Sequence, residues 1–405
     1  MTIRTTIERL GHRGDGVAPG PIFVPMALPG EVVEGVLDGD RLTEVRIITP
    51  SSDRVRPPCR HFKSCGGCAL QHASDSFLGR WKTDVVRTAL SAQGLSAPVE
   101  MIAVSPPASR RRATFSGRRT KKGAVVGFHG RASGAIVEIP DCKLLHPGLM
   151  AVLPALHEIT QTGASRKAEL SLAATWSPAG VDLAVAGGKA LDAELRQTLA
   201  GLADKHGLAR LTWEGETVSC VHPPVQAMGR AQVIPPPGAF LQATVAGQEA
   251  LVDQVVRMAG PARRVADLFA GCGTFALPLA TSAQVVAVEG DEALLEALDM
   301  GWRHATGLKT VTTQARDLFR RPLLPDELAG FDAVVIDPPR AGAEAQIEEI
   351  AISQVNRVVH VSCNPVTFAR DARRLVDAGF GLEVVNVVDQ FRWSAHVELV
   401  ARFLR

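Results

Sequence analysis

The carboxyl-terminal part of the chain alternates between apolar, strand-like runs and helical stretches. Seven such runs follow residue 241: Val265–Phe269, Val285–Glu289, Val311–Ala315, Ala333–Asp337, Val358–Cys363, Leu382–Val388 and Val397–Phe403. Strands that alternate with helices in this way form an open, mostly parallel sheet with helices on both faces. The pattern therefore predicts a seven-stranded, doubly wound α/β domain over residues 241–405.

Two further regions precede this domain. Residues 1–55 contain short β-like runs separated by glycine, which predicts a small β-barrel. This arrangement resembles the TRAM domain, an OB-like RNA-binding module. Residues 56–240 read as a mixed α+β region, and Pro235-Pro236-Pro237-Gly238 marks its boundary with the last domain.

Positive charge is concentrated in one part of the chain. Residues 51–150 carry 16 Lys and Arg against 6 Asp and Glu, although the net charge of the whole chain is only +2. The cluster Arg110–Lys122, which includes Phe115, suits phosphate contacts and base stacking and so indicates an RNA partner. A solvated charged face is the alternative. Because no apolar run is long enough to cross a membrane, we expect a cytoplasmic protein with no membrane partner. We also expect a monomer.

Cys363 ends one of the predicted buried strands, at the point where Asn364-Pro365 stops it. The carboxyl ends of parallel strands form the rim at which open α/β sheets bind ligands. Asp337 ends the preceding strand in the same way, so we expect both side chains to face one cleft. Cys363 is therefore a candidate nucleophile, and the alternative is a small buried core residue.

The first turn of the predicted domain indicates the ligand. Gly271, Gly273 and Ala276 have the spacing of a dinucleotide site. Asp267 lies four residues before the first glycine, where its carboxylate would repel a pyrophosphate but attract the sulfonium and ammonium of S-adenosylmethionine. Glu289, at the end of the second strand, would hold the ribose hydroxyls. We therefore expect a methyl donor in preference to a nicotinamide cofactor.

A methyl donor beside a cysteine nucleophile points to methylation of a pyrimidine at C5. Attack of a thiolate on C6 turns the ring into an enolate, whose C5 can accept a methyl group. A base must then remove the C5 proton before the thiol leaves. Glu398 is the candidate base, because the alternation around Val397 and Leu399 sets it on the opposite face of its strand. A surface carboxylate on an edge strand is the alternative.

Four cysteines are candidates for a metal site. Cys59, Cys65 and Cys68 lie on one glycine-containing loop, and Cys142 is isolated in the sequence. Three thiolates on one loop with a distant fourth are typical of iron-sulfur ligation, whereas zinc ribbons usually carry two C-x2-C pairs. We therefore expect a structural [4Fe-4S] cluster, with zinc or unliganded thiols as the alternatives.

Together these motifs resemble one known family, the uracil-C5 RNA methyltransferases, in the branch that has a TRAM domain and an iron-sulfur cluster. The resemblance rests on the four cysteines, Phe240-Leu241-Gln242, Asp267–Gly273, Asp337–Arg340, Ser362–Pro365 and His396-Val397-Glu398. It implies that Cys363 is the nucleophile and Glu398 the proton acceptor in methylation of a 23S ribosomal RNA uridine, of the uridine-1939 type. It further implies an antiparallel last strand and a methyl donor held by Gln242, Phe269, Gly271, Glu289 and Asp337, with Asp317 near the adenine.

The sequence alone leaves three other functions open. One is methylation of a tRNA uridine, although the tRNA branch usually lacks the four cysteines. Cytosine-C5 methylation of RNA uses the same covalent chemistry, but Asp337–Arg340 lacks the Pro-Cys pair expected there. A non-catalytic RNA-binding protein would be expected to lose Cys363 or Glu398, and both are present. Thr244 and Thr274 replace asparagines that are frequent in the family, which affects only the affinity we expect for the donor.

Overall fold

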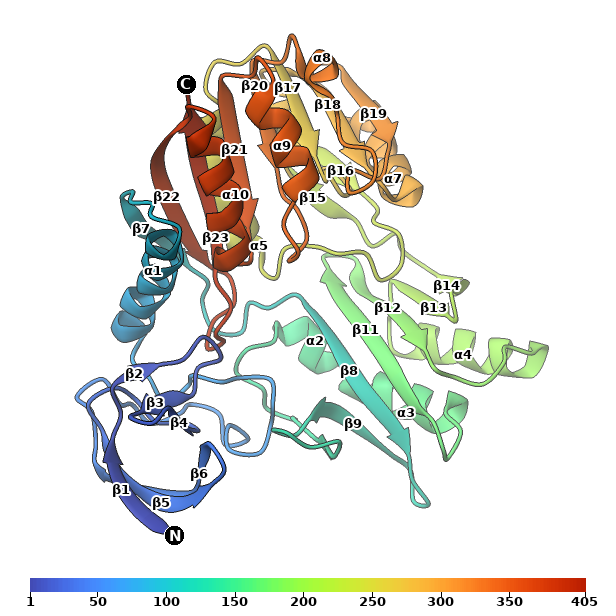
Figure 1. Cartoon of the computed structure of the whole chain (residues 1–405). Coiled ribbons are helices and arrows are strands. Elements are labelled where there is room, and N and C mark those ends of the chain that lie inside the picture. Colours follow the sequence, from blue (N-terminus) through green and yellow to red (C-terminus); the bar gives the residue numbers. More distant parts are fainter.

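Six short strands at the amino terminus form a curled sheet, in the order β1-β5-β6-β4-β3-β2 (Figure 1). The computed structural model describes residues 1–405, and these strands span Thr2–Thr6 (β1), Arg9–Leu10 (β2), Gly16–Ala18 (β3), Ile22–Val24 (β4), Val32–Asp38 (β5) and Arg41–Thr49 (β6). Val33 of β5 turns inward and packs with Ile7, Val24 and Leu42 in a small core. The sheet confirms the OB-like barrel predicted at the start of the chain.

Seven strands in the middle of the chain form a second sheet, in the order β10-β9-β8-β11-β12-β13-β14. They span Arg112–Arg119 (β8), Ala124–His129 (β9), Ile136–Val137 (β10), Glu169–Ser177 (β11), Gly180–Ala186 (β12), Arg210–Trp213 (β13) and Glu216–Cys220 (β14). The helices packed against it are Pro147–Ala151 (α2), Leu153–Gly163 (α3) and Ala193–Lys205 (α4). Gly163 makes room for the buried ring of Trp213, because a Cβ there would lie 2.0 Å from the ring. This is the predicted α+β region.

Eight strands form the carboxyl-terminal sheet, in the order β19-β18-β17-β20-β21-β23-β22-β7. They span Val99–Val104 (β7), Arg264–Leu268 (β17), Gln284–Glu289 (β18), Val311–Ala315 (β19), Ala333–Ile336 (β20), Arg357–Ser362 (β21), Gly381–Asp389 (β22) and Glu398–Leu404 (β23). β23 is antiparallel to its two neighbours, and all other neighbouring pairs are parallel. The seven predicted strands and the antiparallel last strand are confirmed.

Helices cover both faces of this sheet (Figure 1). They span Asp75–Ala92 (α1), Val245–Ala259 (α5), Ala276–Leu279 (α6), Glu292–His304 (α7), Pro325–Leu328 (α8), Glu344–Ile352 (α9) and Pro365–Asp377 (α10). A β-hairpin formed by Gln226–Met228 (β15) and Ala231–Val233 (β16) packs beside α7. α1, α9 and α10 share a core with Val334 and Ile336, whereas α5, α6 and α7 share one with Ala333 and Val335. Alternate residues of β20 therefore fill opposite cores, which confirms the doubly wound architecture. The helices of the chain are too short or too polar to span a lipid bilayer.

Asn364 links the end of β21 to the start of α10. Its side chain accepts a hydrogen bond from the backbone N–H of Val366 at 3.1 Å, and Pro365 occupies the first helical turn. The same side chain donates through Nδ2 to the carbonyl of Arg340 at 2.8 Å, in the loop that follows β20. Asn364 thus fixes the position of Cys363 relative to the neighbouring strand.

α1 and β7 come from the middle of the sequence but pack on the carboxyl-terminal sheet. β7 pairs in parallel with β22, and α1 lies against α10. Lys82 of α1 is fully buried and donates to Asp389 Oδ1 at 2.6 Å and to the carbonyl of Phe391 at 3.2 Å. This eighth strand was not predicted from the sequence, because the run is short and lies outside the strand-helix alternation.

Replacing Lys82 by Met should lower the free energy of unfolding by about 3–5 kcal/mol, because Asp389 would remain buried without its counterion. The midpoint of urea unfolding measures this change. Arg303→Met is the matched control: its ion pair with Asp299 is exposed to solvent, so its loss should change stability by about 1 kcal/mol or less. Equal, small effects of both substitutions would contradict a structural role for the buried pair.

Candidate active site

A cavity of about 770 Å³ lies at the rim formed by the carboxyl ends of β17, β18, β19, β20 and β21. All eight residues predicted to be catalytic or donor-binding line it: Gln242, Phe269, Gly271, Glu289, Asp317, Asp337, Cys363 and Glu398. Glu398 reaches this rim because β23 runs antiparallel to β21, so that its first residue lies where the parallel strands end. The fold thus gathers side chains that are far apart in the sequence around one space.

The turn after β17 has a backbone that few side chains adopt. Phe269 has a φ of 61°, and Gly271 and Gly273 follow with φ of 55° and 97°. At Gly273 a Cβ would also come within 2.8 Å of Leu277, which makes glycine necessary there. Phe269 lines the cavity, where its ring packs against Phe319 with 5.3 Å between the ring centroids. Such local strain is frequently found at ligand-binding sites.

Glu289 is held rigidly at the mouth of the cavity. Its Oε2 accepts a hydrogen bond from the N–H of Gly271 at 3.0 Å, and its Oε1 accepts from the N–H groups of Gly290 at 2.6 Å and Asp291 at 3.1 Å. These contacts tie the carboxylate to the loops after β17 and β18. A carboxylate fixed in this way can accept hydrogen bonds from the hydroxyls of a ligand.

Three carboxyl groups near the cavity have raised pKa values. Burial raises the pKa of Asp267, Asp337 and Glu398, and the charge of Asp337 raises the pKa of the other two further. Asp337 and Glu398 line the cavity, whereas Asp267, which the sequence analysis placed beside the donor, is fully buried behind it. A cation bound next to Asp337 and Glu398 would relieve their repulsion, so the cavity favours a positively charged ligand.

Glu398 lies in the interior of the sheet. β23 has β21 and β22 on its two sides, and Glu398 is only 3% exposed. The alternative of a surface carboxylate on an edge strand is therefore wrong. Its Oε2 accepts a hydrogen bond from Gln390 Nε2 at 2.8 Å. Gln390 was not predicted as a site residue, although a glutamine directly after an apolar strand is an unusual polar residue at this rim.

Cys363 is partly exposed at the end of β21. Burial, followed by the charges of Glu398 and Asp337, raises the pKa of its thiol to about 11, and the cation of Arg340 opposes this shift. The thiol is therefore protonated at neutral pH when no ligand is present. A nearby positive charge would favour the thiolate, which is the nucleophilic form.

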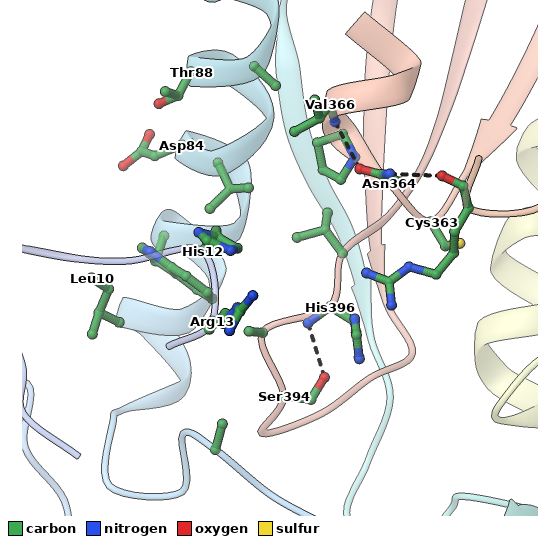
Figure 2. Close-up of a pocket in the computed structure, with 18 of the residues that line it drawn as sticks. Leu10, His12, Arg13, Asp84, Thr88, Cys363, Asn364, Val366, Ser394 and His396 are labelled. Atoms are coloured by element: carbon green, nitrogen blue, oxygen red, sulfur yellow. Dashed lines mark hydrogen bonds between the residues drawn. The ribbon is translucent and has the colours of Figure 1, made fainter. Parts of the chain in front are cut away.

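A second cavity, of about 1480 Å³, opens on another side of Cys363. Figure 2 shows Cys363 and His396 on one side of this space and Leu10, His12 and Arg13 of the amino-terminal region on the other. Four residues line both cavities: Arg110, Arg340, Cys363 and His396. Cys363 thus lies where a ligand of the first cavity can meet a ligand of the second.

Cations surround the second cavity. Five arginines line it: Arg9, Arg13, Arg80, Arg110 and Arg340. They come from the amino-terminal sheet, from α1, from the basic segment and from the loop after β20, and the cavity also contains Phe77 and Trp81. Arginines together with aromatic rings suit a polyanion with exposed bases. Arg110 is the one cation of the predicted basic segment that lines this cavity, and Phe115, which we expected to stack with bases, is instead fully buried in the core of the central sheet. Arg13 and Arg80 were not predicted, because they carry no motif.

The four candidate metal-binding cysteines are free thiols that lie near one another. Cys59, Cys65 and Cys68 are buried, Cys142 is partly buried, and burial raises the pKa of Cys68 to about 12, with contributions from the other three sulfurs. Backbone N–H groups point at two of them, Gly67 at Cys65 Sγ (3.3 Å) and Leu144 at Cys142 Sγ (3.5 Å). No group of three or more His, Cys, Asp or Glu side chains has the arrangement of a metal-ion site.

The Cys363 thiol should react slowly with iodoacetamide at pH 8 and faster as the pH rises toward 11, because only the thiolate is alkylated. Glu398→Gln removes the larger of the two charges that raise its pKa, so alkylation at pH 8 should become about tenfold faster. Arg340→Met should slow it. Peptide mass spectrometry measures the rate at Cys363, with the exposed Cys220 as the internal control. Equal rates in all variants would contradict this electrostatic coupling.

Comparisons with known proteins agree with this geometry. A family model described as tRNA (Uracil-5-)-methyltransferase matches residues 303–404. An RNA methyltransferase of Brucella suis biovar 1 is 46% identical over 403 residues, which cover 99% of this chain and 97% of the relative. The 23S rRNA (uracil(1939)-C(5))-methyltransferase RlmD of Halomonas elongata is 35% identical over 424 residues, covering 97% of this chain and 87% of that protein.

A solved structure shares the whole fold. It is the crystal structure of the Pyrococcus abyssi tRNA (uracil-54, C5)-methyltransferase in complex with S-adenosyl-L-homocysteine, with a TM-score of 0.78, 22% identity and 99% coverage of both chains. Because the sequence relatives are this similar over nearly their whole length, the chain belongs to the uracil-C5 RNA methyltransferases, enzymes that depend on S-adenosylmethionine.

Proposed function

We propose that this enzyme methylates C5 of one uridine in 23S ribosomal RNA, with Cys363 as the nucleophile and Glu398 as the proton acceptor. The observation that carries the proposal is the position of Cys363 between a cavity that favours a cation and a larger cavity lined by arginines. A uracil that enters from the arginine-lined side can meet a methyl donor from the other.

The donor cavity supports a set of contacts to S-adenosylmethionine. Glu289 would accept hydrogen bonds from the ribose hydroxyls, and Asp317, with Phe269 nearby, would flank the adenine. Gln242 and Asp337 would contact the charged end of the donor, and Gly271 lets the chain approach it closely. When bound, the donor supplies an electrophilic methyl carbon and a positive charge beside Asp337, Glu398 and Cys363.

Cys363 makes C5 of uracil reactive. Its thiolate would form an Sγ–C6 bond while the C5–C6 π electrons move toward O4. C5 of the resulting enolate would then bond to the methyl carbon as the bond between that carbon and the donor sulfur breaks, which leaves a neutral thioether. Arg340 and Arg110 line both cavities, where a cation can stabilise the negative charge that develops on the ring. Glu398 then takes the C5 proton, the C5–C6 double bond re-forms, and the Sγ–C6 bond breaks to release Cys363.

Two features support an RNA substrate, and the first of them favours ribosomal RNA. The Halomonas elongata relative, whose name specifies 23S rRNA, is similar over 97% of this chain. The large arginine-lined cavity also has walls from the amino-terminal barrel and from the cysteine loop, which suits a folded RNA segment. A tRNA substrate is the second candidate, because the matching family model and the solved neighbour carry tRNA in their descriptions.

We propose that the three regions predicted from the sequence have different roles. Residues 1–55 form the TRAM-like barrel that guides RNA docking, residues 56–240 form an RNA-binding region that carries the cysteines, and residues 241–405 hold the methyl donor. We further propose that the enzyme acts as a monomer.

Incubation with methyl-labelled S-adenosylmethionine should place label in 5-methyluridine of 23S ribosomal RNA and not in tRNA. Cys363→Ala should abolish methylation and the covalent adduct with 5-fluorouridine RNA while RNA binding persists, because only the attacking sulfur is lost. Glu398→Gln should slow product release by about a hundredfold or more and leave a methylated adduct on the protein. Nucleoside analysis and denaturing gels measure these outcomes.

Three results would contradict the assignment. Label in 5-methyluridine of tRNA alone would shift the substrate to the second candidate, and label in 5-methylcytidine would change the reaction. An adduct that persists in Cys363→Ala would overturn the nucleophile. Lys309→Ala, in a residue outside both cavities, is the control for nonspecific loss of activity.

We propose that Cys59, Cys65, Cys68 and Cys142 hold a [4Fe-4S] cluster, with zinc as the alternative. The donor set supports this: four thiols come together in a buried region, backbone N–H groups point at two of the sulfurs, and the guanidinium of Arg131 lies near Cys68 and Cys65. A bound cluster would join the two ends of the basic segment and so act as a structural crosslink.

Anaerobically purified protein should be brown and contain about four irons per chain. Cys142→Ser should lower both the iron content and the melting temperature, because it removes the one ligand that comes from the distant loop. Cys220→Ser is the matched control, since that cysteine is exposed on β14 and should leave both unchanged. Colourless protein with one zinc per chain would overturn the cluster in favour of the alternative.

A further inference from the structure

Gln390 is a buried glutamine directly after β22; it does not line the donor cavity itself but contacts Gln242 and Glu398, which do. It is 2% exposed, and its side chain makes three hydrogen bonds, two to the consecutive residues Gln242 and Ala243 and one to Glu398. Oε1 accepts from the backbone N–H of Ala243 at 2.7 Å, while Nε2 donates to Gln242 Oε1 at 2.5 Å and to Glu398 Oε2 at 2.8 Å. Gly247 of α5 leaves the space for it, because a Cβ there would lie 2.6 Å from the Cβ of Gln390.

These contacts fix which way round the amide lies. The N–H of Ala243 can only donate, so the atom of Gln390 that faces it must be the oxygen. The NH₂ group is then turned to the other side, and each of its two hydrogens has one acceptor, Gln242 and Glu398. If the amide were turned over so that Oε1 and Nε2 changed places, Nε2 would face the N–H of Ala243, and the oxygens of Gln242 and Glu398 would both face Oε1 without a donor.

We propose that Gln390 is a positioning residue for the methylation reaction, which holds one oxygen of Glu398, leaves the other oxygen free for the C5 proton, and ties this carboxylate to Gln242 in the donor cavity. The inference deepens the proposed function and rests on the role of Glu398 as proton acceptor. Oε2 of Glu398 is taken by Gln390, and no group of the chain donates to Oε1. The base can therefore accept the proton from one defined direction.

The step that Gln390 serves is the release of the methylated RNA. The C5–H bond breaks and its electron pair forms the C5–C6 double bond. The C6–Sγ bond breaks at the same time, and Cys363 leaves as a thiolate. The proton passes to Oε1 of Glu398, so that atoms and charges balance without a further reactant.

The hydrogen bond also opposes the raised pKa of Glu398. Burial and the charge of Asp337 raise that pKa, whereas the N–H donor of Gln390 stabilises the ionised form and lowers it. Charged and titratable groups that line the donor cavity together with this carboxyl include Arg110 before β8, Asp337 and Arg340 after β20, Cys363 after β21 and His396 before β23. The buried pair of Lys82 and Asp389 joins α1 to the end of β22. The uncharged side chain of Gln390 is the group that donates a hydrogen bond directly to Glu398.

Gln390→Met keeps the length of the side chain and removes its amide. In single-turnover reactions with methyl-labelled donor and RNA, the methylated protein–RNA adduct should accumulate and decay about tenfold more slowly than in wild type at pH 7. Loss of the donor raises the pKa of Glu398, so more of the carboxyl is protonated at neutral pH. The decay rate should therefore reach its plateau at a higher pH, and the difference from wild type should shrink toward pH 10.

Two further variants make the test specific. Gln390→Glu still offers an oxygen to Ala243 but gives no N–H to Glu398, so it should shift the pH profile in the same direction even if Gln390→Met folds poorly. Gln254→Met is the matched control, because this glutamine accepts from Asn386 Nδ2 at 2.8 Å and lines neither cavity. Its adduct should decay at the wild-type rate.

The outcomes separate this inference from the function on which it rests. Wild-type decay rates and pH profiles in both Gln390 variants would overturn the positioning role, as would a loss of rate that is the same at every pH. A wild-type enzyme that forms neither labelled adduct nor 5-methyluridine would instead overturn the proposed function. Melting temperatures of all variants identify any change that arises from unfolding.

Discussion

The direction of β23 is the constraint on which the site depends. Parallel strands deliver their carboxyl ends to one rim, so Asp337 and Cys363 reach it as the ends of β20 and β21. A residue at the start of a parallel strand would lie on the opposite edge of the sheet. Because β23 is inserted antiparallel between β21 and β22, Glu398 begins its strand at the same rim.

This arrangement places negative charge where water is scarce. Asp337 and Glu398 line one cavity; burial raises the pKa of both, and the charge of Asp337 raises the pKa of Glu398 further. The same charges keep the thiol of Cys363 protonated in the empty site. A cationic methyl donor would favour the ionised form of all three groups at once, so the ionisation of the Cys363 thiol would depend on whether the donor is bound.

The loop between β22 and β23 connects this chemistry to the rest of the molecule. Lys82 of α1 holds its beginning, and Arg392 donates to Asp75 at 2.5 Å at the start of the same helix. The carbonyl of Trp393 accepts hydrogen bonds from the N–H groups of Ala69 and Leu70, which directly follow Cys68. Hydrogen bonds therefore link the cysteine loop and α1 to the loop that leads into β23, so the order of the cysteine region bears on the position of Glu398.

Local sequence was sufficient for seven of the eight strands of the carboxyl-terminal sheet and for several of the candidate residues. Strand-helix alternation predicted the doubly wound sheet, and strand ends with Asp337 and Cys363 predicted their place at the rim, because these signals depend on neighbouring residues only. Tertiary structure alone decided three things: that β7 and α1 join the last sheet, that Asp267 lies behind the cavity wall, and that Gln390 holds Glu398. Each of these is a contact between segments far apart in the chain, and hydrogen-bond partners at such distances leave no periodic trace in the sequence.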